Sequence, residues 1–334
     1  MDLAIAQKAA GHDVAFVAAD GGYRPLLERY SIPVYSLEGM GGFKSFARLV
    51  WKHREACDSF RPDVIHAHMR AGLLAVLPTA RLRSICVIGH VHNVQEWQSR
   101  FFALADGVIS VSASVSESMR RVGIKPKKLY VVTNGPLDSA RLGSEVELTP
   151  KLIHPSVVTV AGMNERKGIS ELIEAFGLVR KERPDANLYL VGDGPDRDLF
   201  VAKAGESEDA ENIHFEGFCK DPRGYMREAD VFVLASRRDS GPLVLFEARA
   251  AGCAIVASDV DGIPEALDGG RAGVLVPPGN VEVLAAKIVD LLRDERLRKE
   301  MADAALLGLE AYSVARVARE VESVYRSVLL ECSK

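Results

Sequence analysis

Short runs rich in Val and Ile alternate with longer amphipathic stretches along nearly all of the 334 residues, and this alternation constrains the fold more than any other feature. Buried parallel strands read as continuous apolar runs, and the helices that cover both faces of the sheet supply the amphipathic stretches between them. The pattern therefore predicts an α/β protein. It occurs twice, separated by a polar stretch that ends near Pro155, so we expect two Rossmann-like domains in tandem.

The expected domains are residues 1–140, a linker at 141–155, a second domain at 156–311 and a C-terminal helix at 312–334. Each domain has six candidate strands. In the first half these are residues 13–18, 33–37, 63–67, 85–89, 107–111 and 129–133, and in the second half 156–161, 187–191, 212–215, 231–235, 254–257 and 273–276.

The chain opens on the helical face formed by Leu3, Ile5 and Ala9, before the first candidate strand. A doubly wound domain normally opens on a strand, which is central in its sheet. We expect either that the first domain lacks its usual N-terminal strand or that the recorded start lies downstream of the true one.

Composition narrows the class of protein further. No apolar run approaches the roughly 20 residues that span a bilayer, and no signal sequence is present, so a cytoplasmic location is expected. The first half is the more basic, yet no basic stripe with interleaved aromatic residues indicates nucleic-acid binding. Five scattered cysteines argue against a disulfide framework or a zinc site, and we expect buried thiols at Cys57, Cys86, Cys219, Cys253 and Cys332.

The densest chemical signal lies at residues 236–252. A strand ending near Ala235 is followed by a Gly-Pro loop, and Pro242 suits the first helical position, where no N–H is missed. This helix start is a ready site for a diphosphate, and Glu247, just over one turn into the helix, could bond sugar hydroxyls. The alternative is structural: Asp239 and Ser240 simply cap the helix.

Other strands of the second half end in glycine-rich or charged segments. Gly162, Arg166 and Lys167 follow the first of these strands, and the two cations could neutralise phosphate charge. Gly217 and Phe218 follow the third strand. These segments lie at carboxyl ends of predicted parallel strands, the edge at which open α/β sheets bind ligands.

On these segments the sequence strongly resembles the retaining GT-B glycosyltransferases of glycosyltransferase family 4. The resemblance implies two Rossmann-like domains facing a central cleft, with a C-terminal helix that crosses back to the first domain. It implies that Glu247 holds the ribose and that Asp239, at a position where the family has Glu, contacts the transferred sugar. By the same resemblance Gly241 and Leu243 face the sugar and the diphosphate.

The family also places an Arg and a Lys on the diphosphate. The Lys matches Lys167, whereas the Arg position falls on Met163, in a turn that is one residue shorter. Arg166 is a neighbouring substitute, although adjacent residues point in different directions.

Four histidines of the first half lie at or near predicted strand ends: His66, His68, His90 and His92. The last two fall in a segment that resembles the family's threonine-x-histidine motif, which implies that His92 hydrogen-bonds the sugar beside the acceptor. Strand alternation favours a core role for His66, and for His68 an acceptor-side role and a structural role stay open. We expect no metal, because alternate strand residues do not by themselves converge on one ion and no carboxylate completes the set.

Three other sequence patterns point to different functions, but they are less specific than the motifs above. The triplets 196–198 and 259–261 match the loose D-x-D pattern of metal-dependent transferases, which is common by chance. The Gly192-Asp-Gly194 turn suggests a dinucleotide loop, but the third glycine of that motif would fall at Arg197. Residues 43–54 form a basic amphipathic pattern that could dock on a membrane; a crossover helix that packs Phe46, Leu49 and Val50 on its own sheet is favoured.

The sequence thus predicts a metal-independent retaining glycosyltransferase that uses a UDP- or GDP-linked sugar as co-substrate and no other cofactor. By analogy with the family, the acceptor is a saccharide or lipid-linked hydroxyl, the setting is polysaccharide or glycolipid assembly, and a peripheral contact with the inner face of the membrane is an open alternative. The competing hypothesis is a sugar-nucleotide-binding GT-B protein without efficient transfer, such as a regulatory or partner subunit.

Overall fold

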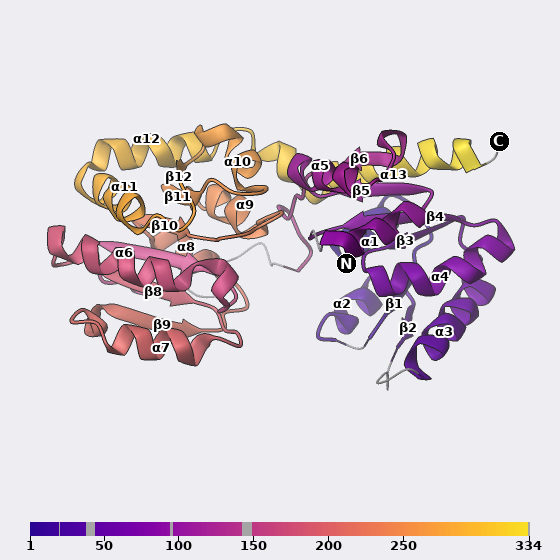
Figure 1. The fold of residues 1–334 in the computed structure, drawn as a ribbon, viewed down its shortest axis with the longest axis horizontal. Helices are drawn as coiled ribbons and strands as arrows, with labels where there is room; N and C mark the ends of the chain where they lie inside the picture. Colours follow the sequence, from indigo (N-terminus) through magenta and orange to yellow (C-terminus); the bar gives the residue numbers. More distant parts are fainter. Residues whose placement is uncertain (20, 38–43, 94–95, 142–148, 333–334) are drawn as a thin grey trace. The chain divides into compact units, whose positions relative to one another are not determined.

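The computed structural model describes residues 1–19, 21–37, 44–93, 96–141 and 149–332. Internal contacts divide the chain into two compact units (Figure 1). Unit 1 comprises Met1–Arg141 together with Tyr312–Lys334, and unit 2 comprises Leu142–Ala311. Within the expected linker at 141–155, residues 142–148 lie outside the described residues.

Unit 2 is built on one six-stranded parallel sheet with the order β12-β11-β10-β7-β8-β9. Its strands are β7 (Ser156–Val160), β8 (Asn187–Val191), β9 (Ile213–Gly217), β10 (Val231–Leu234), β11 (Ile255–Ser258) and β12 (Val274–Val276). Its helices are α6 (Ile169–Glu182), α7 (Arg197–Gly205), α8 (Arg223–Glu228), α9 (Leu243–Ala250), α10 (Ile263–Ala266), α11 (Val281–Arg293) and α12 (Glu295–Ala305).

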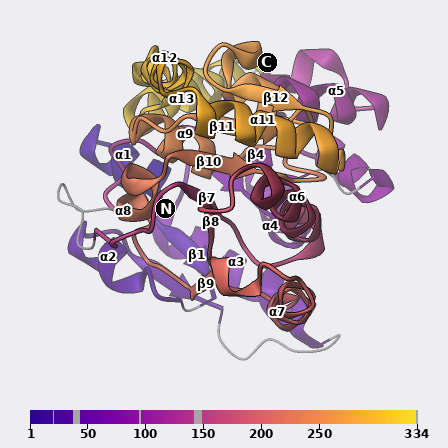
Figure 2. The same cartoon turned by 90° about the vertical axis from the view of Figure 1, so that its left-hand side faces the viewer.

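Helices cover both faces of this sheet, as a parallel sheet requires. Helices α6 and α11 lie side by side (Figure 2), and their apolar sides, including Phe176 and Ile288, pack on Val157 and Val233 of the central strands. Helix α9 contacts both α8 and α12, and these two helices contact strands β7 and β11 respectively. The hydrophobic core of unit 2 therefore lies between the helices and the faces of the sheet, and the loops that follow the strands lie at the edge where the strands end.

Unit 1 contains a two-stranded and a four-stranded parallel sheet with the orders β1-β2 and β3-β4-β5-β6. The strands are β1 (Phe16–Ala18), β2 (Val34–Ser36), β3 (Val64–Ala67), β4 (Cys86–Val91), β5 (Gly107–Ser110) and β6 (Leu129–Val131). The helices are α1 (Asp2–Ala9), α2 (Arg24–Arg29), α3 (Lys44–Phe60), α4 (Arg70–Arg83), the 3-10 segment η1 (Glu96–Leu104), α5 (Ala113–Arg121) and α13 (Val314–Cys332). All twelve predicted strands are present, and the α/β prediction is confirmed.

The C-terminal helix α13 belongs to unit 1. Val321, Val324 and Val328 are buried in a cluster with Ile88 of β4 and Ile109 of β5. The residue that opens the C-terminal part of unit 1 lies beside the end of its N-terminal part: the Leu137 N–H donates to the Tyr312 carbonyl at 3.1 Å. In Figure 1 the helix, drawn in yellow, lies along the strands of the four-stranded sheet.

Two expectations about unit 1 are wrong. Cys86 and Cys332 form a disulfide because α13 ends beside β4, a proximity between residues 246 positions apart that spacing alone cannot reveal. The expected burial of Phe46 is also not found: Phe46 and Trp51 are 46% and 58% exposed, Leu49 and Val50 are partly buried, and α3 packs on α4. Phe43, at the start of the same amphipathic pattern, lies outside the described residues.

Candidate functional site

The strand order of unit 2 marks where a ligand would bind. From β7 the chain moves outward through β8 and β9 on one side and through β10, β11 and β12 on the other. The direction switches between β7 and β10, and open α/β sheets bind ligands outside the carboxyl ends of the strands at such a point. Lys167 lies in the loop after β7, and Asp239 lies in the loop after β10.

These two loops are tied together by a buried ion pair. The Lys167 Nζ donates to the Asp239 Oδ2 at 2.6 Å, and the side chains are only 15% and 8% exposed. The two residues that sequence analysis assigned to the diphosphate and to the sugar are therefore direct neighbours. The pair holds one positive and one negative charge at the switch point, each available to a polar ligand that replaces its partner.

Close backbone contact between the loops depends on a glycine. Gly168 has φ +67°, and a Cβ there would lie 1.9 Å from the Ala235 carbonyl oxygen at the end of β10. The Arg237 N–H also donates to the Arg166 carbonyl at 2.9 Å. A larger residue at 168 would push the loops apart and separate Lys167 from Asp239.

Met163 and Arg166 occupy different environments. Met163 is fully buried in the core of unit 2, and the N–H of this residue donates to the Asp193 carbonyl at 2.9 Å. Arg166 is exposed, and its guanidinium donates to the Arg238 carbonyl at 3.2 Å. Of the two positions considered for a diphosphate-binding arginine, only Arg166 presents a cation at the loop surface; Gly162 lies exposed in the same loop.

The acidic triplets support the loops. The Glu165 N–H donates to Asp196 at 2.9 Å, and Asp261 accepts from the Asp239 N–H at 3.0 Å and from the Arg238 Nε at 2.8 Å. Asp261 thus holds the backbone of Asp239 in position. This role of Asp261 could not be predicted from the sequence, because it depends on the β11 loop lying beside the β10 loop.

Helix α9 begins at Leu243, and Pro242 is the N-cap residue, one position earlier than predicted. Gly241 and Leu243 lie at this helix start, and Glu247 is half-buried in the next turn. Gly217 ends β9 with φ +73°, and the Phe218 ring that follows is 78% exposed. All donor-side candidates therefore lie at the carboxyl edge of the unit 2 sheet.

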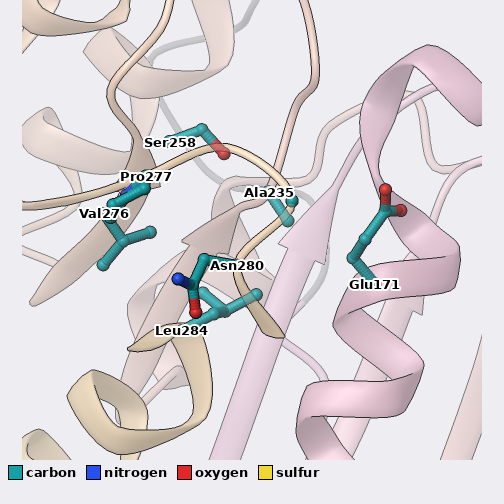
Figure 3. Close-up of a pocket in the computed structure, with 8 residues that line it drawn as sticks. Glu171, Ala235, Ser258, Val276, Pro277, Asn280 and Leu284 are labelled. Carbon is teal, nitrogen blue, oxygen red and sulfur yellow. The ribbon is translucent and has the colours of Figure 1, made fainter. Parts of the chain in front are cut away.

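A small cavity lies at the same edge (Figure 3), lined by Glu171, Ala235, Ser258, Val276, Pro277, Gly279, Asn280 and Leu284. Its volume of about 10 Å³ has room for one water molecule, not for a nucleotide. Glu171 pairs with Arg237, and its second carboxylate oxygen has no hydrogen-bond partner among the described residues. Glu171 was not among the predicted site residues, since an acid in the first turn of an amphipathic helix is ordinarily exposed.

The predicted site residues of unit 1 belong to a compact histidine cluster, defined here as His66, His68, His90 and His92. The expectation that these rings do not converge is wrong. Parallel pairing of β3 with β4 places His66 beside Ile88, so alternate positions of both strands fall on one face. His66 Nε2 lies 3.1 Å from His90 Nδ1, and His68 Nδ1 lies 3.0 Å from His92 Nε2.

Burial controls the protonation of the histidine cluster. Desolvation lowers the pKa of His66 and His90 well below the usual value, lowers the pKa of His68 to about 3, and lowers the pKa of His92. The rings are consequently neutral at physiological pH, and each carries one N–H and one lone pair. His92 is thus suited to hydrogen bonding rather than to charge neutralisation. The partners of His66 are His90 and the Tyr325 hydroxyl.

Two family models match the two parts of the chain. The model described as Glycosyltransferase Family 4 matches residues 1–136, and the model described as Glycosyl transferases group 1 matches residues 154–294.

Individual relatives match longer stretches of the chain than either family model does. Glycogen synthase of Mycobacterium tuberculosis is 26% identical over 270 residues, covering 74% of this chain and 64% of its own length. The N,N'-diacetylbacillosaminyl-diphospho-undecaprenol alpha-1,3-N-acetylgalactosaminyltransferase of Campylobacter jejuni is 29% identical over 238 residues, covering 68% of this chain and 62% of its own length. The chain thus spans less than two thirds of these relatives.

Solved structures establish the fold. Anabaena HepE, in a complex with UDP-glucose, superposes with a TM-score of 0.81 at 20% identity, over 98% of this chain and 95% of that one. The chain therefore has the GT-B architecture of two Rossmann-like domains.

Proposed function

The chain belongs to the family 4 (group 1) glycosyltransferases, and from that premise we propose that it is a retaining enzyme that moves a sugar from a nucleotide-diphosphate sugar to a hydroxyl acceptor. The observation that carries this proposal is the Lys167–Asp239 pair at the switch point of unit 2, beside the start of α9. The relatives named above, a glycogen synthase and a transferase named for a diphospho-undecaprenol substrate, support a saccharide or lipid-linked acceptor.

In this proposal unit 2 holds the donor. The ribose hydroxyls bond to Glu247, and the diphosphate lies on Lys167, on Arg166 and on the amides near Gly241 and Leu243. The bond between the sugar anomeric carbon and the diphosphate oxygen breaks, and its electron pair leaves with the phosphate. Preorganised cations and amides stabilise the negative charge that develops there.

Unit 1 holds the acceptor in this proposal. The acceptor oxygen bonds to the anomeric carbon on the face that the diphosphate leaves, which preserves the configuration, and the acceptor proton passes to the departing phosphate. His92 hydrogen-bonds the sugar, and His68 fixes the tautomer of His92 through their 3.0 Å contact. Asp239 contacts the transferred sugar once the donor has drawn Lys167 toward the phosphate.

The test is Glu247→Gln, assayed by calorimetry with a donor that binds the wild-type chain in a screen of UDP-, GDP- and ADP-linked sugars. Loss of charged hydrogen bonds to ribose should weaken binding by about 10-fold, or about 1.4 kcal/mol. The matched control is Glu211→Gln, because Glu211 is exposed and precedes β9 at the opposite edge of the sheet. Unchanged affinity in a folded Glu247→Gln protein would remove the donor assignment.

We also propose that transfer needs no metal, because Lys167, Arg166 and the helix amides supply the positive charge. Turnover of a verified donor and acceptor should therefore persist in EDTA. Activity that vanishes and returns only with a divalent ion would overturn the metal-free proposal and would make the acidic triplets that contain Asp196 and Asp261 candidates for metal binding again.

Two observations favour a second candidate, a sugar-nucleotide-binding protein with little transfer. Met163 is buried where the family places an arginine, and Asp239 is one methylene shorter than the family's Glu. Tight donor binding without transfer to any acceptor, or to water, would support this candidate.

A peripheral membrane contact would use α3. Phe46 and Trp51 are exposed on this helix, and Lys52 lies 5.0 Å from the Trp51 ring centre. Basic and aromatic residues on one helix suit an anionic lipid surface. None of the helices among the described residues has the length and apolar character needed to cross a membrane.

A further inference from the structure

The histidine cluster contains more imidazole groups than the proposed acceptor contact uses. That contact needs His92 and its neighbour His68, whereas His66 and His90 lie within the strands. One ring nitrogen each of His66, His68 and His90 lies within 4.8 Å of the other two, and His92 is 3.0 Å from His68. Four neighbouring imidazoles therefore bring several nitrogen lone pairs into one small volume.

One ring nitrogen of His90 is buried without a hydrogen-bond partner. The residue is 5% exposed, and its Nε2 has no hydrogen-bond partner among the residues that the structure describes. A buried polar atom left without a partner costs free energy whichever tautomer it adopts. A cation bound at this nitrogen would take up its lone pair, so the orphaned atom is an independent indication of a ligand.

The chemistry of the cluster selects the ligand. Neutral imidazoles suit Zn²⁺, Co²⁺, Ni²⁺ and Cu²⁺, whereas Mg²⁺ and Ca²⁺ prefer oxygen ligands. Ligation uses the neutral form of imidazole, whose second ring nitrogen has a lone pair for the ion. Tyr325 hydrogen-bonds His66 at Nδ1, the kind of outer contact that orients a ligating histidine and leaves its Nε2 available.

We propose that His66, His68, His90 and His92 form a binding site for one late first-row divalent ion, such as Zn²⁺, on one face of β3 and β4. The rings stack in pairs, His66 on His68 and His90 on His92. Binding would therefore require the rings to rotate until one nitrogen of each, Nε2 in the case of His90, faces the ion, and this rotation would break the two nitrogen–nitrogen hydrogen bonds. Because His68 and His92 also belong to the proposed acceptor site, the bound ion would withdraw them from it. Only this last consequence rests on the proposed function.

The experiment is a titration of the tag-free, chelator-treated wild-type chain with Co²⁺, in which the visible d–d absorption of the bound ion is measured. Zn²⁺ is then added as the competing ion. We expect one ion per chain and no displacement by Mg²⁺. His90→Asn and His66→Asn should each weaken binding at least about 10-fold, and Tyr325→Phe should weaken it by roughly 10-fold as an orienting residue. His214→Asn is the matched control, because His214 lies on β9 in unit 2.

Three outcomes would overturn the site. The first is no Co²⁺ binding, which would leave the cluster as a hydrogen-bonded histidine network. The second is unchanged affinity in His90→Asn and His66→Asn. The third is a thiolate charge-transfer band, which would place the ion on cysteine sulfur instead, at the Cys86, Asp106 and Cys332 group with its disulfide reduced.

A measurement on the wild-type chain covers the case in which the variants do not fold. X-ray absorption of the Zn²⁺-loaded protein should show imidazole nitrogens at about 2.0–2.1 Å. A first shell dominated by oxygen or sulfur would reject the proposal. None of these readouts requires transferase activity, so the metal site and the proposed function can fail separately.

Discussion

Lys167 and Asp239 combine a structural role with the proposed chemical one. Both side chains are largely buried and lie 2.6 Å apart. Removing one member of a buried ion pair leaves the other charge without compensation, whereas replacing both with neutral groups of similar size is often tolerated. Stability and activity should therefore respond differently to single and paired substitutions.

Lys167→Met should lower the free energy of unfolding of unit 2 by about 3 kcal/mol, because Asp239 stays buried without its cation. The double variant Lys167→Met with Asp239→Asn should recover most of that stability but no transfer activity, since both proposed ligand contacts are gone. Urea unfolding and turnover on a verified donor measure the two effects. Lys181→Met, at the opposite end of α6, is the control. A double variant as active as the wild-type protein would show that the Lys167–Asp239 pair is purely structural.

At the scale of elements, the pairing of β3 with β4 makes the stability of unit 1 sensitive to pH. Burial lowers the pKa of His68 from 6.5 to about 3 and lowers the pKa of the other three cluster histidines. Below pH 6.5 the unfolded chain binds protons that the folded chain does not, so stability rises with pH in this range and falls on acidification.

The free energy of unfolding of unit 1 should therefore fall between pH 7.5 and pH 5.5, by up to about 1.4 kcal/mol per pH unit for each histidine. Urea unfolding with chelator present measures this slope, and His68→Gln should make it shallower. His12→Gln, beyond the end of α1, is the control. A slope that is the same in all three proteins would show that the cluster does not govern the acid response.

The same elements show what sequence can and cannot predict. The strand runs were predictable because buried parallel strands are continuously apolar. The place of Lys167 and Asp239 at the carboxyl edge of the sheet was predictable because each residue follows a predicted parallel strand. The convergence of the four histidines was not predictable, because it depends on the register between β3 and β4. The burial of Met163 and the Cys86–Cys332 bond likewise depend on tertiary neighbours.

At the scale of the whole molecule, unit 1 is assembled from both ends of the chain. Helix α13 buries Val321, Val324 and Val328 against the four-stranded sheet, and Arg316 donates to the Thr133 carbonyl at 2.8 Å. Burying each valine contributes about 1.5–3 kcal/mol, so their sum is comparable to the stability of a typical domain. We therefore propose that α13 is the family's crossing helix and that unit 1 cannot hold its sheet without it.

Truncation after Tyr312 should accelerate hydrogen exchange in β4 and β5, because their apolar face loses its cover, while exchange in β7 and β10 stays close to that of the full chain. Truncation after Leu330 is the control: it removes Cys332 and hence the disulfide to Cys86, but keeps the three valines. If both truncations disturb β4 and β5 equally, the disulfide rather than the packed helix holds the sheet. Exchange that changes only within residues 149–311 would place the contribution of α13 in unit 2 and contradict the crossing.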